Sequence, residues 1–217
     1  MPGTTPVYGF PYPEPTDLVA DYPALGQQLA EDIEDVLPTV GGMTAIAPTT
    51  IANSGGSAST TAATTTFTGV SSISLNGVFS ASHDNYRVVC DYTTGTSGGI
   101  VTNFRFRTAG TDNTAAVYQL RGADVGAFTS ISVNDQNLAA MTTGRDGGNA
   151  MVLDVVSPFA ARYTHCPFTV HSATVAVIAL ARFGVMSHLS TTSFDGFSII
   201  TASSTITGRV TVYGYSK

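Results

Sequence analysis

The sequence has little charge, and its charge is unevenly placed. Asp, Glu, Lys and Arg together make up 11% of the 217 residues, against about 25% in an ordinary soluble domain. The first 40 residues contain seven acidic residues and no basic one, and Arg87 is the first basic residue of the chain. The net charge of −6 argues against a nucleic-acid-binding protein, because such proteins neutralise phosphates with Lys and Arg. The asymmetry predicts two parts with different surroundings.

The sequence also lacks the segments that mark membrane or exported proteins, and it contains few cysteines. No apolar run approaches the ~18 residues of a membrane-spanning helix, and the start of the chain lacks the basic and apolar regions of a secretory signal. We therefore expect neither membrane insertion nor an export signal. The sequence has no Trp and only two cysteines, Cys90 and Cys166. Without an export signal, two buried free thiols are favoured over a structural disulfide.

Catalytic motifs are also missing. All the Glu residues lie among the first 34 residues, and most of the later Asp residues stand beside Gly, Asn or Ser, where Asp commonly stabilises turns. A glycosidase needs two carboxyl groups at a fixed separation, so this pattern disfavours glycoside hydrolysis. The histidines lack zinc-motif spacing, and neither a GxSxG elbow nor a glycine loop for phosphates occurs. We expect no enzymatic activity, no metal and no cofactor.

Residues 1–42 are predicted to serve attachment and oligomerisation. Five prolines between residues 2 and 15 alternate with Tyr8, Phe10 and Tyr12. Proline favours extended backbone in its own position and in the preceding residue. Three aromatic residues within five positions suit an arm that lies on a partner surface better than a tail left in water.

Residues 21–37 are predicted to form a short amphipathic helix. Apolar residues recur there at spacings of three and four and define one stripe; its members are Tyr22, Leu25, Leu29, Ile33 and Val36. A helix of about four turns is marginal alone, so something must cover the stripe. The candidates are the β domain of the same chain, copies of the helix in a short parallel bundle, or a foreign surface.

The remainder of the chain is predicted to be a linker followed by a β domain. Residues 43–66 are small and polar, with Gly55-Gly56 at their centre, which is typical of a linker. Residues 67–217 contain roughly eight to ten short alternating runs separated by turn signals, without a helical period. This pattern predicts an antiparallel β-sandwich, jelly-roll-like, as a head domain. Residues 173–181 are apolar apart from Thr174 and predict a strand buried on both faces.

Aromatic side chains are the strongest candidates for recognition. The chain has nine Tyr and eleven Phe, and aromatic rings can stack on the apolar faces of sugars. The candidate glycan contacts are Tyr118, Phe128, Tyr163 and Phe168. For each of them, however, packing in the core is favoured over a glycan contact.

Several segments together resemble a group of bacteriophage structural proteins: minor tail proteins, tail fibres and head fibres, particularly of phages that infect actinobacteria. The resemblance lies in SSISLNGVFSASHDNYRVVCDY (71–92), FRFRTAGTDNTAAVY (104–118), HLSTTSFDGFSI (188–199), TITGRVTVYGYSK (205–217) and the N-terminal YGFPYPEPTDLVADYPALGQQLAEDIEDVL. It implies a non-enzymatic virion component that is usually a homotrimer. Residues 119–187 do not share it, and variable surface loops are expected there.

These observations lead to one expectation and two alternatives. We expect a phage virion protein that is assembled in the host cytoplasm as a homotrimer. Residues 1–42 would bind other virion proteins of the tail or capsid, and residues 67–217 would face outward and bind a host-surface glycan, as in a tail fibre or receptor-binding protein. A capsid decoration or head-fibre protein is the first alternative. A polysaccharide depolymerase is the second, and the missing carboxylate pair counts against it.

Overall fold

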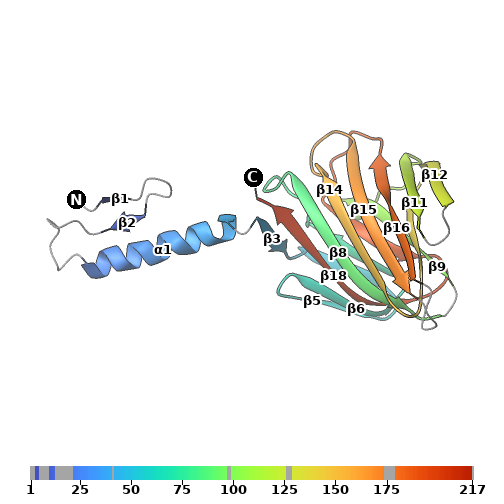
Figure 1. Cartoon of the computed structure of the whole chain (residues 1–217), viewed down its shortest axis with the longest axis horizontal. Coiled ribbons are helices and arrows are strands. Elements are labelled where there is room, and N and C mark those ends of the chain that lie inside the picture. Colours follow the sequence, from blue (N-terminus) through green and yellow to red (C-terminus); the bar gives the residue numbers. More distant parts are fainter. Residues whose placement is uncertain are drawn as a thin grey trace. The chain divides into compact units, whose positions relative to one another are not determined.

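The structure is a computed structural model that describes residues 3–4, 10–12, 22–40, 42–96, 99–125, 129–173 and 179–216 (Figure 1). The chain divides into two units. One comprises residues 1–44 and residue 216, and the other comprises residues 45–215 and residue 217. Each unit is described by itself below.

The first unit contains the predicted helix, α1 (Tyr22–Val40). The short strands β1 (Gly3–Thr4) and β2 (Pro11–Tyr12) pair with each other in antiparallel fashion. The helix runs three residues past the predicted end and stops before the glycine pair at 41–42, where Gly42 has a φ of +70°. Within the described residues, no helix is both long and apolar enough to cross a membrane.

Part of the predicted helix stripe is visible in the first unit. Leu25 and Leu29 are half-buried, whereas Tyr22 and Ile33 are exposed. Val36 belongs to the helix, but its side chain lies outside the described residues. In the predicted arm, Phe10 is half-buried and Tyr12 is exposed, and Tyr8 lies outside the described residues. What covers the stripe and the arm stays a prediction.

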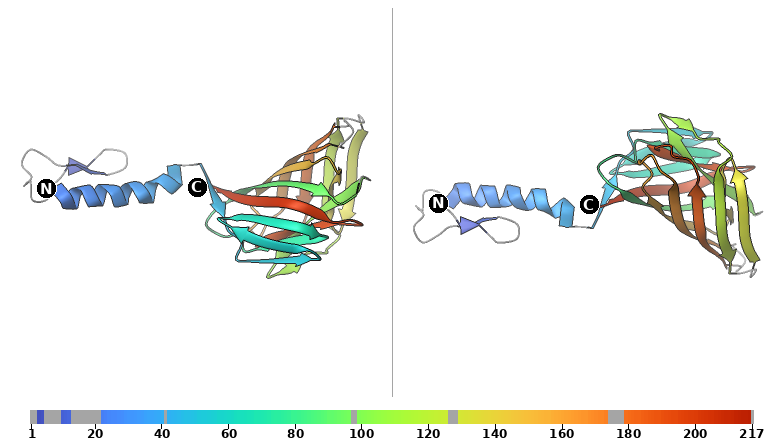
Figure 2. Two further views of the ribbon diagram at one scale, coloured as in Figure 1. Left: turned by 90° about the horizontal axis from the view of Figure 1, so that it is seen from below. Right: turned by 90° about the horizontal axis from the view of Figure 1, so that it is seen from above.

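The second unit is an antiparallel β-sandwich, which confirms the predicted fold class. The chain passes repeatedly between two sheets, so that strands distant in sequence become neighbours (Figures 1 and 2). The larger sheet has the order β12-β11-β16-β15-β14-β8-β18-β6-β5, with β3 beside β18. The smaller sheet has the order β10-β9-β17-β7-β4, with β13 beside β9.

The strand bounds are as follows: β3 (Met43–Ile46), β4 (Thr50–Ser54), β5 (Ser57–Thr61), β6 (Thr64–Val70), β7 (Ser72–Asn76), β8 (Asn85–Thr94), β9 (Ile100–Thr108), β10 (Thr111–Asp112), β11 (Tyr118–Asp124), β12 (Thr129–Gln136), β13 (Ala139–Gly144), β14 (Asn149–Val156), β15 (Thr164–Ala173), β16 (Ala179–His188), β17 (Gly196–Thr201) and β18 (Ile206–Tyr215).

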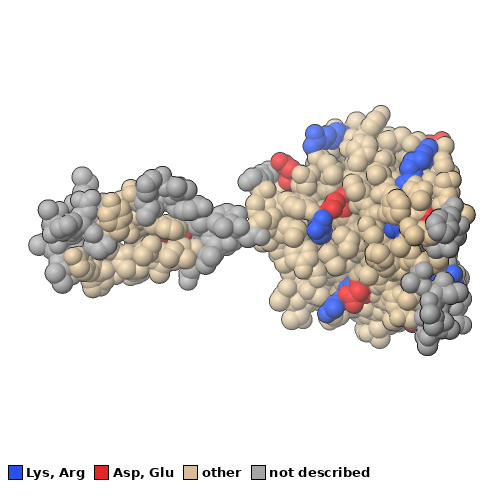
Figure 3. All heavy atoms as spheres, in the orientation of Figure 1, with Lys and Arg blue, Asp and Glu red and all other residues tan. Residues whose placement is uncertain are grey.

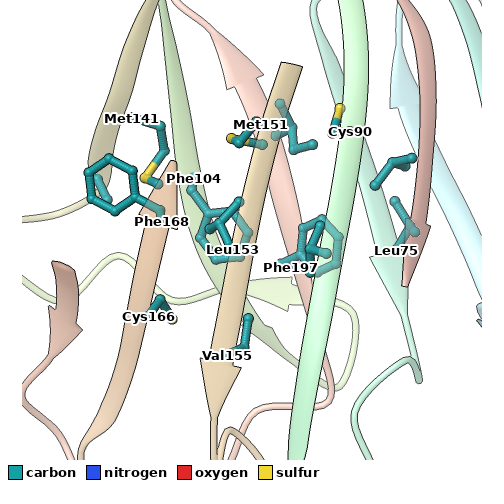
Figure 4. Packing of buried hydrophobic residues seen from close by; sticks show 14 of the residues in the cluster. Leu75, Cys90, Phe104, Met141, Met151, Leu153, Val155, Cys166, Phe168 and Phe197 are labelled. Carbon is teal, nitrogen blue, oxygen red and sulfur yellow. The ribbon is translucent and has the colours of Figure 1, made fainter. Parts of the chain in front are cut away.

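The core lies between the two sheets and follows from alternation along each strand. In β14 and β15 every second residue is buried, because successive side chains point to opposite faces. Figure 4 shows inward side chains of both sheets packed together, and the rings of Phe104 and Phe197 stack at 5.0 Å. Cys90 and Cys166 are buried free thiols, which confirms that interpretation over a disulfide. Burial raises the pKa of both thiols.

The predicted linker at 43–66 is wrong. These residues form β3, β4, β5 and the start of β6, and β5 and β6 pair directly. Threonine is β-branched and suits strands, and its hydroxyl can bond across a pair. The Thr60 and Thr65 hydroxyls lie 2.8 Å apart, and those of Thr64 and Thr211 lie 3.0 Å apart. Small polar residues here form a strand ladder, which is interrupted by bends at Gly55-Gly56 and Ala62-Ala63, where all four residues have positive φ.

The prediction of one doubly buried strand over 173–181 is also wrong. β15 ends at Ala173 and β16 begins at Ala179, and the two strands pair with each other. The apolar run therefore spans the end of one strand and the start of the next, with residues 174–178 outside the described part of the chain. An all-apolar run carries no period that could separate these two arrangements.

Candidate functional site

The outward side of three neighbouring strands of the larger sheet carries several exposed apolar side chains. Because the alternate residues point into the core, the remaining positions of β14, β15 and β16 face outward. We call this surface the β14–β16 face, and its members are Val152, Asp154, Val156, His165, Pro167, Thr169, Phe183, Val185 and Ser187. None of these side chains is buried.

The β14–β16 face includes several exposed apolar side chains. Phe183 is 52% exposed, Val185 40% and Val156 38%. The first two line an open depression of about 540 Å³ that also includes Pro167 and Thr169. In the orientation of Figure 1, where β14, β15 and β16 lie in front, most of the surface is uncharged and charged atoms occur in small groups (Figure 3). Exposed apolar surface of this kind marks interaction sites.

A glycine pair shapes the sheet at this depression. Gly184 of β16 lies opposite Gly122 of β11 and opposite Phe168 of β15. A Cβ atom on Gly184 would lie 2.2 Å from the carbonyl oxygen of Arg121 and 2.8 Å from the Cα of Gly122. The two strands therefore approach closely only because both positions lack a side chain. Gly184 lines the depression, and Phe168, although buried, lines its floor.

A fixed ion pair stands at the edge of the depression. The Nε and Nη2 atoms of Arg87 each donate to a different oxygen of Asp154, both at 2.8 Å. The Tyr215 hydroxyl donates to Asp154 Oδ1 at 2.6 Å, and the Arg87 guanidinium lies 5.8 Å from the centre of the Tyr215 ring. The hydrogen bonds from Arg87 lower the pKa of Asp154 despite partial burial, and those to Asp154 raise the pKa of Arg87. Both groups stay charged and held in place.

A second depression continues the face beyond the end of β14. It has a volume of about 530 Å³ and is lined by Val156, Arg162, Tyr163, His165 and Thr191. Val156 and His165 are cross-strand partners, and Val156 lies two residues from Asp154, about 7 Å along the strand. The two depressions are therefore neighbours on one surface.

The structure places some of the predicted glycan contacts on the surface and others in the core. Tyr163 is 52% exposed and lines the second depression. Tyr118 was a wrong choice, since it is buried between the sheets, stacks on Phe106 at 6.2 Å and accepts a hydrogen bond from the Phe106 backbone N–H. Phe168 points inward. Phe128 lies outside the described residues.

Sequence reasoning missed Phe183, Arg87 and Asp154. Phe183 alternates with Arg182 and Gly184, and Arg182 turns inward to pair with Asp124 at 2.6 Å. The local pattern would therefore have placed an arginine outside and the phenylalanine inside. Arg87 and Asp154 are 67 residues apart and meet only through the register of β8 with β14. Within the described residues, no group of three or more His, Cys, Asp or Glu is placed to hold a metal ion.

Comparison with known proteins gives little. No protein-family model matches the sequence, and no curated protein matches it. Among solved structures, the chain is similar to the CBM2 module of the evolved Dit of Lactobacillus casei BL23 phage J-1. The likeness has a TM-score of 0.28 and 10% identity over 82% of this chain and 91% of that one. A TM-score of this size does not establish a common fold.

Proposed function

We propose that the chain is a non-enzymatic phage virion protein whose β domain binds a host-surface glycan on the β14–β16 face, as in a tail fibre or receptor-binding protein. The observation that carries the proposal is the half-exposed ring of Phe183 over an open depression whose edge holds the Arg87–Asp154 pair. A sugar ring has apolar C–H faces and a rim of hydroxyls. An exposed aromatic ring suits the first, and a fixed guanidinium–carboxylate pair suits the second.

The rigidity of the polar groups supports recognition. A carboxylate that is already oriented by two hydrogen bonds from Arg87 and one from Tyr215 loses little freedom when a ligand binds, which reduces the entropic cost of association. Its remaining lone pairs can accept from sugar hydroxyls. The surrounding surface comes from strands rather than loops, so the positions of the contacts are fixed by the sheet.

The charge state of Asp154 supports binding rather than hydrolysis. A glycosidase needs a protonated carboxyl group to donate to the leaving oxygen, and its pKa must be raised for that purpose. The pKa of Asp154 is lowered, mainly by the hydrogen bonds from Arg87. This carboxylate can orient a sugar but holds no proton to donate, so it is unsuited to be the general acid that a depolymerase needs.

The glycan proposal is tested by truncating the exposed ring. Purified full-length protein is titrated with host-envelope polysaccharide, and Phe183→Ala is expected to weaken binding on the order of 30-fold, the effect of a well-placed aromatic contact. Val101→Ala is the control, since Val101 is 39% exposed but lies on the smaller sheet. Equal affinity of Phe183→Ala and the wild-type protein would contradict the proposed site.

Assembly and attachment complete the proposal. The half-buried Leu29 and the exposed Ile33 leave an apolar stripe that three parallel helices could cover, and a trimer would combine three weak glycan sites into one avid particle. Leu29→Asp should convert a trimer into monomers in sedimentation equilibrium while the β domain stays folded. A variant that remains trimeric would show that the helix does not hold the subunits together.

The place of the protein on the virion separates the proposal from capsid decoration. Antibodies against residues 67–217 should label the tail of intact particles in electron micrographs. Label spread over the head instead would reject the receptor-binding assignment in favour of a decoration protein.

A further inference from the structure

The second depression of the β14–β16 face has a chemical character of its own. Its lining contains an arginine, a histidine, a tyrosine, a threonine and a valine, but no Asp or Glu. Tyr163 is 52% exposed there, so an aromatic ring and a guanidinium border the same open space. The His165 Nδ1 lies 2.9 Å from the Ser187 hydroxyl oxygen, which orients the imidazole at the edge of the site.

The segment that carries Arg162 is tied down by backbone hydrogen bonds. The N–H of Ser157 donates to the carbonyl of Asp84 at 2.9 Å, and the N–H of Arg162 donates to the carbonyl of Ala160 at 2.8 Å. The Ser157 backbone has a φ of +53°, an unfavourable value for a residue with a side chain. The surrounding contacts therefore hold this turn, and with it Arg162, in one place.

Arg162 differs from most arginines of the β domain in its partner. Arg87, Arg107, Arg182 and Arg209 each pair with an aspartate. The Nη2 of Arg162 donates to the neutral hydroxyl of Ser157, and the ion pairs found among the described residues do not include Arg162, although Asp84 lines a small pocket together with it. A guanidinium has five N–H donors and no acceptor. This exposed guanidinium therefore has N–H donors available to a ligand.

We propose that this depression binds an anionic group of the glycan, a carboxylate or a phosphate, through Arg162, while Tyr163 stacks on the sugar that carries it. The inference rests on the proposed function and specifies its ligand class, an acidic oligosaccharide. A guanidinium matches both carboxylate and phosphate oxygens in bidentate geometry. The neighbouring first depression, with Phe183, takes an adjoining sugar of the same chain, because both depressions open on one face.

The test compares each acidic oligosaccharide with its own neutral form. The probes are uronic-acid oligosaccharides, the same oligosaccharides after reduction of their carboxyl groups to alcohols, and a phosphodiester-linked glycerol–sugar polymer. We expect at least one acidic probe to bind full-length protein tenfold or more tightly than the reduced probes. The uronic acid and phosphodiester arms show which anion is preferred. Reduced probes that bind as well as every acidic one would overturn the inference, and so would the absence of binding by all acidic probes.

Substitutions assign the preference to one side chain. Arg162→Gln should abolish the difference between acidic and reduced probes, and Arg162→Lys should retain part of it. Arg209→Gln is the matched control, because Arg209 lies on the same sheet but is already paired with Asp91 at 2.7 Å. A preference that survives in Arg162→Gln would reject this site for the anion.

The same binding data distinguish a failure of the proposed glycan face from a failure of the proposed anion site. If Phe183→Ala weakens every probe but Arg162→Gln changes no preference, the glycan face stands and the anion site is wrong. If Arg162→Gln abolishes the preference but Phe183→Ala has no effect, the anion site stands and the role of Phe183 is wrong.

Discussion

The outer faces of the two sheets are built from similar short, weakly charged strands, yet they differ in how much of their central surface is exposed to solvent. On the smaller sheet, Arg107 is only 9% exposed and lies over the Ser74 and Ser198 hydroxyls. On the larger sheet, Phe183 and its neighbours remain open to solvent. The first face has satisfied its own polar groups, and the second has apolar surface left over.

The hydrogen bonds of the smaller sheet show how its outer face is closed. Ser74 and Ser198 are cross-strand partners with hydroxyls 2.8 Å apart, and Ser198 donates to Asp112 at 2.7 Å. Arg107 donates to Asp112 and to the Asn76 side chain. Each buried polar group in this row has a partner, which is the usual condition for burial. The difference teaches that exposed aromatic and cationic groups distinguish the proposed binding face, since composition alone would not separate the two faces.

The largest loss of stability is expected from a substitution that disrupts the hydrogen-bonded row on the outer face of the smaller sheet. Arg107→Ala removes the cation from a pair whose side chains are 11% and 24% exposed. It leaves Asp112 with only Arg105, whose Nη1 lies 3.6 Å from Asp112 Oδ2, and leaves two hydroxyls without the guanidinium. Removing one member of a buried pair costs about 3–5 kcal/mol, and the partial exposure of Asp112 places the expected loss near the lower end. Urea denaturation measures it.

The exposed pair of the other sheet is the control for this loss. Arg209→Ala removes a cation that is 66% exposed from a pair with Asp91, and it should leave the urea midpoint unchanged because exposed pairs contribute little. Similar midpoint shifts for the two variants would show that the row of the smaller sheet is not a closed network. Glycan binding by Arg107→Ala, measured under conditions where it remains folded, should equal that of the wild-type protein.

Much of the fold is predictable from the sequence, and the reason is periodicity. The alternation in β14, β15 and β18 and the spacing of Leu25 and Leu29 in α1 specify strand and helix without knowledge of any partner. Periodicity fails where a run is uniformly polar or uniformly apolar. Residues 43–66, which are mostly small and polar, and residues 173–181, which are mostly apolar, come close to such runs, so neither shows its strands by alternation.

The candidate site was less predictable because register creates it. Tyr163 could be proposed as a glycan contact from its residue type, but the same reasoning applied equally to Tyr118, which is buried. Arg87 and Asp154 become partners only when β8 and β14 align. Phe183 faces outward because Arg182 finds an inward partner in Asp124 on a different strand. None of these pairings leaves a local signal in the sequence.

A smaller effect on stability, which depends on pH, is expected because the inward side chains of the two sheets differ in whether they titrate. Under the smaller sheet the inward aromatic residues include Phe104 and Phe197, which do not titrate. The larger sheet contributes His188, which is fully buried, packs edge-on against Tyr118 at 4.6 Å and has an Nδ1 atom without a hydrogen-bond partner among the described residues. Burial lowers the pKa of His188 to about 4.

Because this pKa lies below the ordinary value of about 6.5, the folded state favours neutral histidine and the unfolded state takes up the proton first. The contribution to stability is complete above pH 6.5 and is lost as the pH falls towards 4. We expect the free energy of unfolding to drop by about 2 kcal/mol between pH 7 and pH 5. In His188→Gln the drop should be much smaller, although the variant is less stable at pH 7. Parallel pH profiles for the two proteins would show that His188 does not take up the proton, and the acid sensitivity would then have to come from another group.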